Sequence, residues 1–135
     1  MIRYLADTNI LGYFARRTHA PLQQRMRVAL HRQEVAISVI TRAETRFGLA
    51  LLDAKDKRRA SIGLLLQEIP SLPWTPEAAD RYGEIAAQLQ QTGQSIGAMD
   101  TMIAAHALVS DLTVVTHNTR HFGRIAGLKL EDWTV

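Results

Sequence analysis

Short apolar runs that end in a polar residue and lead into a helical period recur along this chain of 135 residues. The first, IRYLAD, predicts a buried strand, and TNILGYFARR directly after it predicts a helix that begins at Asp7 or Thr8. VAISVI at 35–40 and LTVVTHN at 112–118 are rich in β-branched residues and predict two further strands. Strands separated by helices favour an α/β fold with a mainly parallel sheet flanked by helices.

The remaining segments extend this alternation. Helical periods are expected in PLQQRMRVALHRQ, TRAETRFGLALLD, KRRASIGLLLQEI, TPEAADRYGEIAAQLQQTG and GAMDTMIAAHALVS, and short strands near LPW and in LKLEDW. In the second of these helices, Ala43, Phe47, Ala50 and Leu51 recur at helical spacing. No repeat and no linker rich in Gly, Pro or Ser interrupts the pattern, so we expect a single domain over residues 1–135.

Composition narrows the chemistry that the chain can carry out. It contains no cysteine, which excludes a disulfide framework and a thiolate nucleophile or metal ligand. Arg3 and Asp7 interrupt the first apolar run, and no apolar stretch approaches the ~20 residues of a transmembrane helix. We therefore expect a soluble, cytoplasmic protein without a membrane partner.

Basic residues outnumber acidic ones by 16 to 13 and gather in three places. These are Arg16 with Arg17, then Arg25, Arg27 and Arg32, and finally KDKRR at 55–59. Basic faces attract phosphates regardless of sequence, so the clusters suit a polyanionic partner such as RNA. Ordinary solvent-exposed helix faces would give the same pattern, and the sequence leaves both interpretations open.

Three acids that are far apart in the sequence occupy equivalent places beside predicted strands. Asp7 follows the first strand, Glu44 lies one turn into the helix after the second, and Asp100 lies in the first turn of a late helix. Because the carboxyl ends of parallel strands share one edge, where ligands bind, the three acids can converge on one pocket. Each also has a structural interpretation: Asp7 and Asp100 suit helix N-termini, and Thr41 with Glu44 fits a capping box.

Convergence of three carboxylates would favour a cation. Two charges ~4 Å apart repel by roughly 4 kcal/mol at an effective dielectric constant of 20, unless a cation neutralises them or a proton is shared. Oxygen ligands without cysteine suit Mg²⁺ or Mn²⁺. Mg²⁺ usually takes one or two protein carboxylates and keeps several waters, which leaves a third acid to orient or deprotonate a water. The pattern is typical of metal-assisted phosphodiester hydrolysis.

Four segments occur in the order expected of a known family: LADTNILGYF, ISVITRAETRFG, GAMDTMIAAHAL and VVTHNTRHFGRIAGLKLEDW. Together they resemble VapC-type toxins, the PIN-domain ribonucleases of bacterial type II toxin–antitoxin pairs. The resemblance implies a PIN-like three-layer sandwich and a Mg²⁺-dependent endoribonuclease that cleaves tRNA or rRNA, with Mn²⁺ as a substitute ion. It also implies a VapB-like antitoxin that covers the active-site groove, and a homodimer.

The family's functional residues fall on the same three acids. The resemblance implies that Asp7, Glu44 and Asp100 are catalytic and that Asp7 and Asp100 bind the metal. Glu44 would lie nearby, contacting the ion directly or through water. Thr8 and Asn9 would shape the site by hydrogen bonds.

One position departs from the family's pattern. Asn118 stands where many relatives have Asp, and His121 stands where some have Glu. Asn118 brings no charge, so we favour a one-metal site in which its amide supports the site through a hydrogen bond to water. His117 and His121 border the expected site and are candidate contacts for RNA phosphates, whereas His106 is expected to be structural.

Two other functions remain open at this point. A catalytically decayed PIN-like module that binds RNA or protein would explain the missing fourth acid, although the chain retains the other three. A phosphotransferase with Asp7 as nucleophile would need a second acid close by. The residue two positions later is Asn9, which disfavours that alternative.

Overall fold

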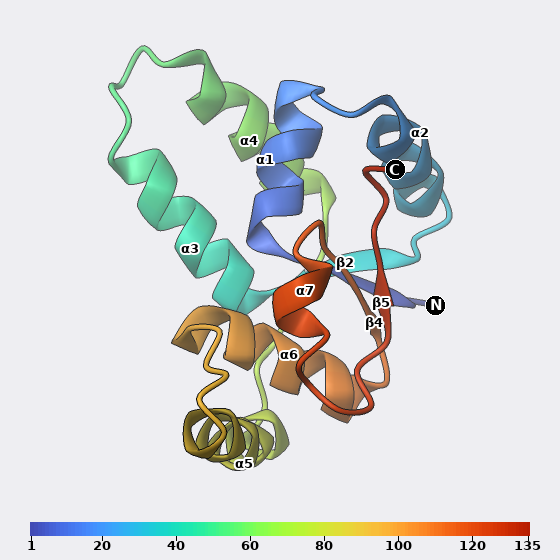
Figure 1. Ribbon diagram of the computed structural model, residues 1–135. Coiled ribbons are helices and arrows are strands. Elements are labelled where there is room, and N and C mark those ends of the chain that lie inside the picture. Colours follow the sequence, from blue (N-terminus) through green and yellow to red (C-terminus); the bar gives the residue numbers. More distant parts are fainter.

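The computed structural model describes all residues 1–135 and contains one five-stranded parallel sheet (Figure 1). The strands are β1 (Tyr4–Ala6), β2 (Val35–Ser38), β3 (Ser71–Leu72), β4 (Thr113–Val115) and β5 (Leu130–Glu131). Their order across the sheet is β3-β2-β1-β4-β5, and every neighbouring pair is parallel. The predicted α/β class is therefore confirmed.

Helices connect the strands in the predicted alternation. They are α1 (Thr8–Arg16), α2 (Ala20–His31), α3 (Val39–Ala50), α4 (Lys57–Glu68), α5 (Pro76–Gln91), α6 (Ala98–Ser110) and α7 (Thr119–Phe122). None of them combines the length and the apolar character that crossing a membrane would require. Pro76 starts α5, and the Thr75 hydroxyl caps that helix by accepting a hydrogen bond from the backbone N–H of Ala78.

The helices cover both faces of the sheet and so form three layers (Figure 1). Residues of α1, α2 and α4 pack with Ala6, Ile37 and Val115 on one face. Residues of α5, α6 and α7 pack with Leu5 and Val114 on the other. Neighbouring strand residues belong to opposite cores because side chains alternate along a strand. The predicted three-layer sandwich is confirmed.

The central strand β1 fixes where a site can form. It pairs with β2 on one side and with β4 on the other, so the chain reverses its direction across the sheet at β1. Ala6 is in register with Val115, which places Asp7 beside Thr116 just beyond the carboxyl ends of these strands. In open parallel sheets, the crevice at such a switch point is the usual ligand site.

Two strands end earlier than the sequence indicated. VAISVI was expected to remain a strand to residue 40, but β2 ends at Ser38. The Ser38 hydroxyl accepts a hydrogen bond from the backbone N–H of Ile40 at 3.1 Å, and this cap begins α3 at Val39. LTVVTHN was expected to end at Asn118, but β4 ends at Val115, and Asn118 is the N-cap residue of the unpredicted short helix α7.

The apolar stripe on α3 identified the helix but lies on its exposed side. Phe47 and Leu51 are 68% and 72% exposed, whereas Thr41 and Leu49 are the buried residues of α3. Helical spacing alone does not say which face meets the core, because packing against α1, α4 and α6 decides it.

Buried aromatic and imidazole groups hold the layers together. Trp133 is buried, as expected of a packing residue, and its ring meets that of Tyr4 edge-on at 4.9 Å between centroids. His106 is also buried, and its Nδ1 lies 2.8 Å from the Ser38 hydroxyl, so it links α6 to the start of α3. Burial lowers the pKa of His106, which agrees with the expected structural role.

Candidate active site

Asp7 is the most tightly held acid of the site. It is only 3% exposed and directly follows β1, where it is the N-cap of α1. Its Oδ1 accepts a hydrogen bond from the backbone N–H of Ile10 at 3.0 Å, and its Oδ2 accepts one from the Thr116 hydroxyl at 2.6 Å. The capping interpretation of Asp7 is therefore correct, and each of its carboxylate oxygens has a protein donor.

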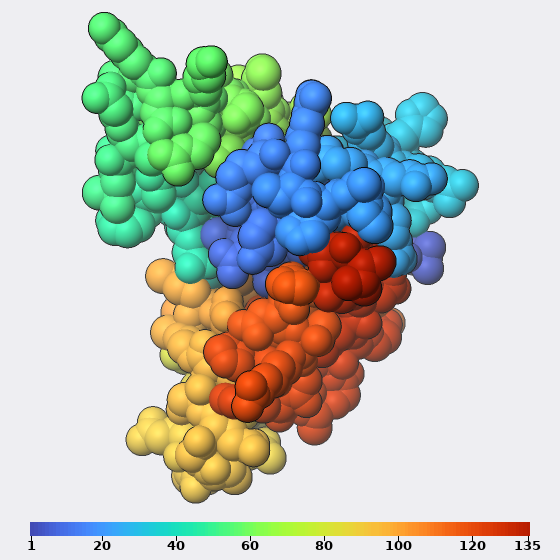
Figure 2. Space-filling view, turned by 45° about the horizontal axis from the view of Figure 1, so that its top comes forward, coloured from blue at the N-terminus to red at the C-terminus, as the bar shows by residue number.

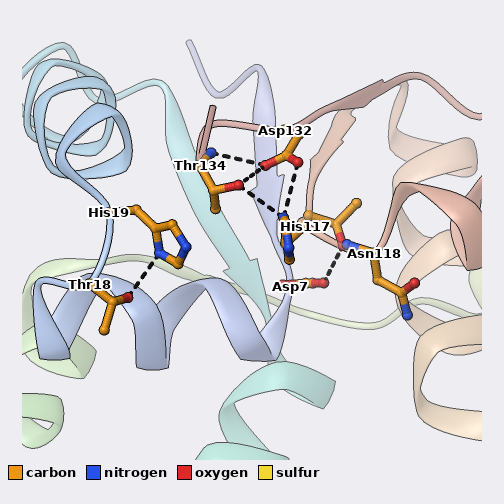
Figure 3. Close-up of polar contacts among 8 residues, drawn as sticks. Asp7, Thr18, His19, His117, Asn118, Asp132 and Thr134 are labelled. Carbon is orange, nitrogen blue, oxygen red and sulfur yellow. Dashed lines mark hydrogen bonds and ion pairs between the residues drawn. The ribbon is translucent and has the colours of Figure 1, made fainter.

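Thr116 connects Asp7 to the loop after β4, and the sequence interpretation did not identify it. Its hydroxyl donates to Asp7 and accepts a hydrogen bond from the backbone N–H of Asn118 at 2.9 Å. In Figure 3, Asp7, His117 and Asn118 lie together at this end of the sheet. A hydroxyl directly after a β-branched strand was the available signal, but its partner is 109 positions away in the chain.

Glu44 projects from α3 toward the start of α1. The Thr8 hydroxyl donates a hydrogen bond to its Oε1 at 2.6 Å, which joins the start of α1 to α3. Asn9 is exposed, and no hydrogen bond to its side chain forms in the structure. Thr8, Asn9 and Glu44 nevertheless line the same groove.

The capping-box interpretation of Thr41 and Glu44 is wrong. α3 begins at Val39 with Ser38 as its cap, so Thr41 already lies within the helix and cannot be the N-cap residue. Its hydroxyl is buried without a hydrogen-bond partner. Glu44 therefore does not cap α3, and its carboxylate accepts a hydrogen bond from Thr8 instead.

Asp100 lies in the first turn of α6 and is half-buried. No protein hydrogen bond reaches its carboxylate. Burial raises the pKa of Asp100, the charge of Glu44 raises it further, and His121 opposes the shift. Asp100 therefore shares one electrostatic environment with Glu44 and His121, as convergence at the sheet edge predicts.

Asp7 belongs to the same environment. The pKa of Asp7 is raised to about 6, and burial is the largest cause. Hydrogen bonds from Thr116 and Ile10 lower this pKa, whereas the charges of Asp100 and Glu44 raise it further. The charges of the three acids that the sequence singled out thus act on one another. Perturbed carboxylates that repel one another are typical of sites built for a cation or a proton.

Asn118 and the neighbouring histidines complete the rim. The Asn118 side-chain amide lies 2.9 Å from Nδ1 of His121. His117 instead turns toward the C-terminal segment, where its Nδ1 lies 3.1 Å from Asp132 Oδ2 and 2.9 Å from the Thr134 hydroxyl (Figure 3). The sequence interpretation missed Asp132 and Thr134, because only the fold brings them beside His117.

The donor set fits an open magnesium site rather than an enclosed one. Nowhere do three or more acidic, histidine or cysteine side chains stand close enough together to enclose a metal ion. The charged groups that act on Asp7 are the carboxylates of Asp100 and Glu44, and their repulsion adds to the burial that raises its pKa. Mg²⁺ needs only one or two carboxylates and fills its remaining positions with water and phosphate, so Asp7 and Asp100 are sufficient candidates.

A groove of about 240 Å³ lies between α1, α3 and α4, and Glu44 is the only one of the three acids that lines it. Thr8 and Glu44 line it together with Arg16 and Arg58. The carboxylate of Glu44 and the guanidinium groups of Arg16 and Arg58 thus share one concave surface.

Comparison with known proteins agrees with this architecture. The family model for the PIN domain matches residues 4–128, and the chain therefore belongs to the PIN domain family. Within that family, it is similar to VapC ribonucleases over nearly its whole length, so the resemblance to VapC-type toxins is confirmed. The tRNA(fMet)-specific endonuclease VapC of Shigella flexneri is 34% identical over 134 residues, which cover 99% of this chain and 100% of the relative. Ribonuclease VapC2 of Rickettsia felis is 30% identical over 96% of this chain and 97% of its own length.

Solved structures of VapBC complexes share the fold. DNA-bound VapBC from Salmonella typhimurium superimposes with a TM-score of 0.89 at 31% identity, covering 98% of this chain and 99% of that chain. VapBC2 from Rickettsia felis, bound to a DNA fragment from its promoter, superimposes with a TM-score of 0.87 at 30% identity and the same coverage.

Proposed function

We propose that the chain is the toxin of a type II toxin–antitoxin pair and acts as a Mg²⁺-dependent endoribonuclease. The observation that carries the proposal is the convergence of Asp7, Glu44 and Asp100, from three separate elements, on one electrostatic environment. Relatives named as ribonucleases support the reaction class. A relative named for tRNA(fMet) makes tRNA the first substrate to test, with rRNA as the alternative.

Asp7 and Asp100 would hold the ion, with Mn²⁺ as a substitute for Mg²⁺. A bound ion would supply positive charge beside the scissile phosphate and acidify a water. Asp7 is suited to a fixed ligand because Ile10 and Thr116 hold its orientation. Asp100 has no protein hydrogen bond to break, so its carboxylate, on α6, is suited to be the second ligand.

Glu44 would act as the general base. Thr8 donates to Oε1 and orients the carboxylate, which leaves Oε2 to accept a proton from the attacking water. Asn118 and Asn9 would support the site by hydrogen bonds to water or RNA. Attack by water predicts products with 5′-phosphate and 3′-hydroxyl ends.

A VapB-like antitoxin is the proposed physiological partner. The similar structures are VapBC complexes, which supports a partner of this kind. We further propose that the toxin is a cytoplasmic homodimer, as the resemblance implies. Addition of the cognate antitoxin should abolish RNA cleavage, and full activity of the mixture would contradict the pairing.

The test is cleavage of total tRNA and rRNA by purified protein with Mg²⁺, with Mn²⁺ and with EDTA. Asp7→Ala and Asp100→Asn should lose metal-dependent cleavage while remaining folded. Asp111→Asn is the matched control, because Asp111 lies just after the same helix as Asp100 but pairs with Lys129 on the surface. Products that end in 2′,3′-cyclic phosphate would contradict the mechanism, since the RNA's own 2′-hydroxyl would then be the nucleophile.

A decayed PIN-like binding module is the second candidate. Two observations favour it: Asn118 stands at the position of a fourth acid, and the acids do not form an enclosed metal cage. Absence of cleavage under every condition, in protein shown to be free of antitoxin, would support this module and refute the nuclease.

A further inference from the structure

Helix α2 presents a basic surface without acids. From Ala20 to Gln33 the chain contains no Asp or Glu, and Arg25, Arg27 and Arg32 are all exposed. The buried side of the helix consists of Leu22, Met26 and Ala29. Every charged group that α2 offers to solvent is therefore positive.

Salt bridges leave two of these guanidinium groups unpaired. The bordering acids Glu34 and Glu131 pair with Arg3 at 3.2 Å and with Arg25 at 2.8 Å. Neither Arg27 nor Arg32 forms a salt bridge anywhere in the structure. Both are free to meet an external anion without first breaking an internal contact.

The basic surface of α2 is connected to the candidate active site through two histidines. His19 directly precedes α2, and its ring centre lies 6.1 Å from that of His117, two residues before the start of α7. Thr18 contacts Nδ1 of His19 at 2.9 Å, while Asp132 and Thr134 contact Nδ1 of His117 (Figure 3). The Nε2 atoms of His19 and His117 have no protein partner, so both can contact a ligand that extends from the candidate active site toward α2.

Helix α2 and the edge of the candidate site lie on the same face of the molecule. Figure 2 shows α1, α2, the C-terminal segment and α7 on one face. A groove of about 260 Å³ runs beside α2, and its charged lining consists of Arg3, Arg25 and Arg32 with one acid, Glu34. The guanidinium of Arg25 lies 5.1 Å from the ring centre of Trp133, which holds one wall of the groove in place.

We propose that substrate RNA continues from the catalytic edge across His117 and His19 and docks its phosphates along the basic surface of α2. The inference rests on the proposed nuclease function and adds the direction in which the RNA leaves the site. The 12 residues of α2 span about 18 Å, enough for several phosphates. RNA is favoured over an acidic protein because the path begins where a phosphodiester must lie for cleavage.

The second basic cluster, KDKRR, is a weaker candidate for the same role. Asp56 accepts two side-chain hydrogen bonds from Arg58, at 3.0 and 2.7 Å, and also caps α4. Side-chain and backbone hydrogen bonds from Arg58 lower the pKa of Asp56 to about 2, so its charge stays beside the arginine. This cluster neutralises part of its own charge, as an ordinary solvated helix end does.

The test compares RNA binding by two double variants. Fluorescence anisotropy of a fluorescein-labelled tRNA is measured in EDTA, in an Asp7→Asn background that cannot cleave, between about 50 and 200 mM salt. Arg27→Gln with Arg32→Gln should weaken binding at least about fivefold and reduce the salt slope by about 1.5, the value for two lost phosphate contacts. Lys57→Gln with Arg59→Gln removes the same charge from α4 and should leave the affinity and the slope near those of the parent.

Three results would overturn the inference. The first is unchanged RNA affinity in the α2 variant. The second is an equal loss of RNA affinity in both variants, which would indicate an effect of net charge alone. The third is loss of inhibition by the antitoxin with unchanged RNA affinity, which would assign the surface to a protein partner. Measuring cleavage distinguishes failure of this inference from failure of the proposed function.

In the chain that retains Asp7, the α2 substitutions should raise KM for RNA cleavage with little change in kcat. A parent that binds RNA through α2 but never cuts it would refute the nuclease and leave the docking surface standing.

Discussion

The strand side and the helix side of the site hold their acids differently. Asp7 is buried at the end of β1, and each of its oxygens receives a hydrogen bond. Glu44 and Asp100 lie on α3 and α6, with one side-chain donor for Glu44 and none for Asp100. The strand side is therefore preorganised, whereas the helix side can adjust to an ion and to RNA.

This difference carries an energetic cost at Asp7. Keeping a charge buried beside two other carboxylates opposes ionisation, which raises the pKa of Asp7 to about 6. The fold retains an electrostatically unfavourable carboxylate at a buried position, as expected when a residue serves function more than stability.

The largest effect should come from the helix side. Glu44→Gln keeps the size of the side chain but removes the proposed base, so kcat for RNA cleavage should fall about 10²- to 10⁴-fold. Binding of Mn²⁺ should persist, since Asp7 and Asp100 are the proposed ligands. Glu68→Gln on α4 is the matched control and should keep normal activity. Normal cleavage by the Glu44 variant would remove Glu44 from the mechanism.

On the strand side, Asp7→Asn should stabilise the protein in EDTA at neutral pH. The folded-state pKa of Asp7, about 6, lies above the ordinary aspartate value of 3.8, so protonation favours the folded state. That stabilisation is fully present below pH 3.8 and is lost as pH rises through about 6. The rise in pKa from 3.8 to about 6 corresponds to about 3 kcal/mol, which is an upper estimate for the stability gained in the variant.

Urea unfolding of both proteins at pH 4 and pH 7.5 measures this effect. The free energy of unfolding of Asp7→Asn should exceed that of the parent at pH 7.5, and the difference should shrink toward pH 4. A difference in unfolding free energy that does not change with pH would show that the fold does not raise the pKa of Asp7.

Thr116→Val should loosen the strand side with a smaller effect. The substitution removes the hydrogen bond to Asp7 and the acceptor for the backbone N–H of Asn118, which should cost about 1–3 kcal/mol of unfolding free energy. Thr113→Val, at the start of the same strand, is the control, because its hydroxyl forms no hydrogen bond in the structure. Equal unfolding free energies of the two variants would contradict the proposed role of Thr116 in holding Asp7.

Asn118→Asp should produce the smallest change. A carboxylate at this position adds a charge near Asp7 and Asp100, so the Mg²⁺ concentration for half-maximal cleavage should fall a few-fold. Asn118→Ala separates the new charge from loss of the contact with His121. A requirement for more Mg²⁺ in the Asp variant would place Asn118 away from the ion.

Local chemistry made most of the fold predictable. The Asp7 cap, the Thr75–Pro76 helix start and the alternation of strands and helices all depend on residues close together in the chain. The same reasoning placed Asp7, Glu44 and Asp100 at equivalent positions, because parallel strands share one carboxyl edge.

What the sequence could not supply depends on distant contacts. Thr116 matters through a partner 109 positions away, and His117 is oriented by Asp132 and Thr134 from the C-terminal segment. The capping-box error at Thr41 has a local cause: two hydroxyl residues lie three positions apart, and the strand ends at Ser38, the earlier one.

Direct measurement of ion binding tests the central claim that Asp7 and Asp100 together hold one cation. Mn²⁺ can be titrated into the full chain at pH 7.5 and followed by electron paramagnetic resonance, with Asp100→Asn and Asp111→Asn in parallel. We predict one saturable site per chain, retained in Asp111→Asn and lost in Asp100→Asn. Absence of saturable binding to the parent, or equal binding by Asp100→Asn, would contradict the claim.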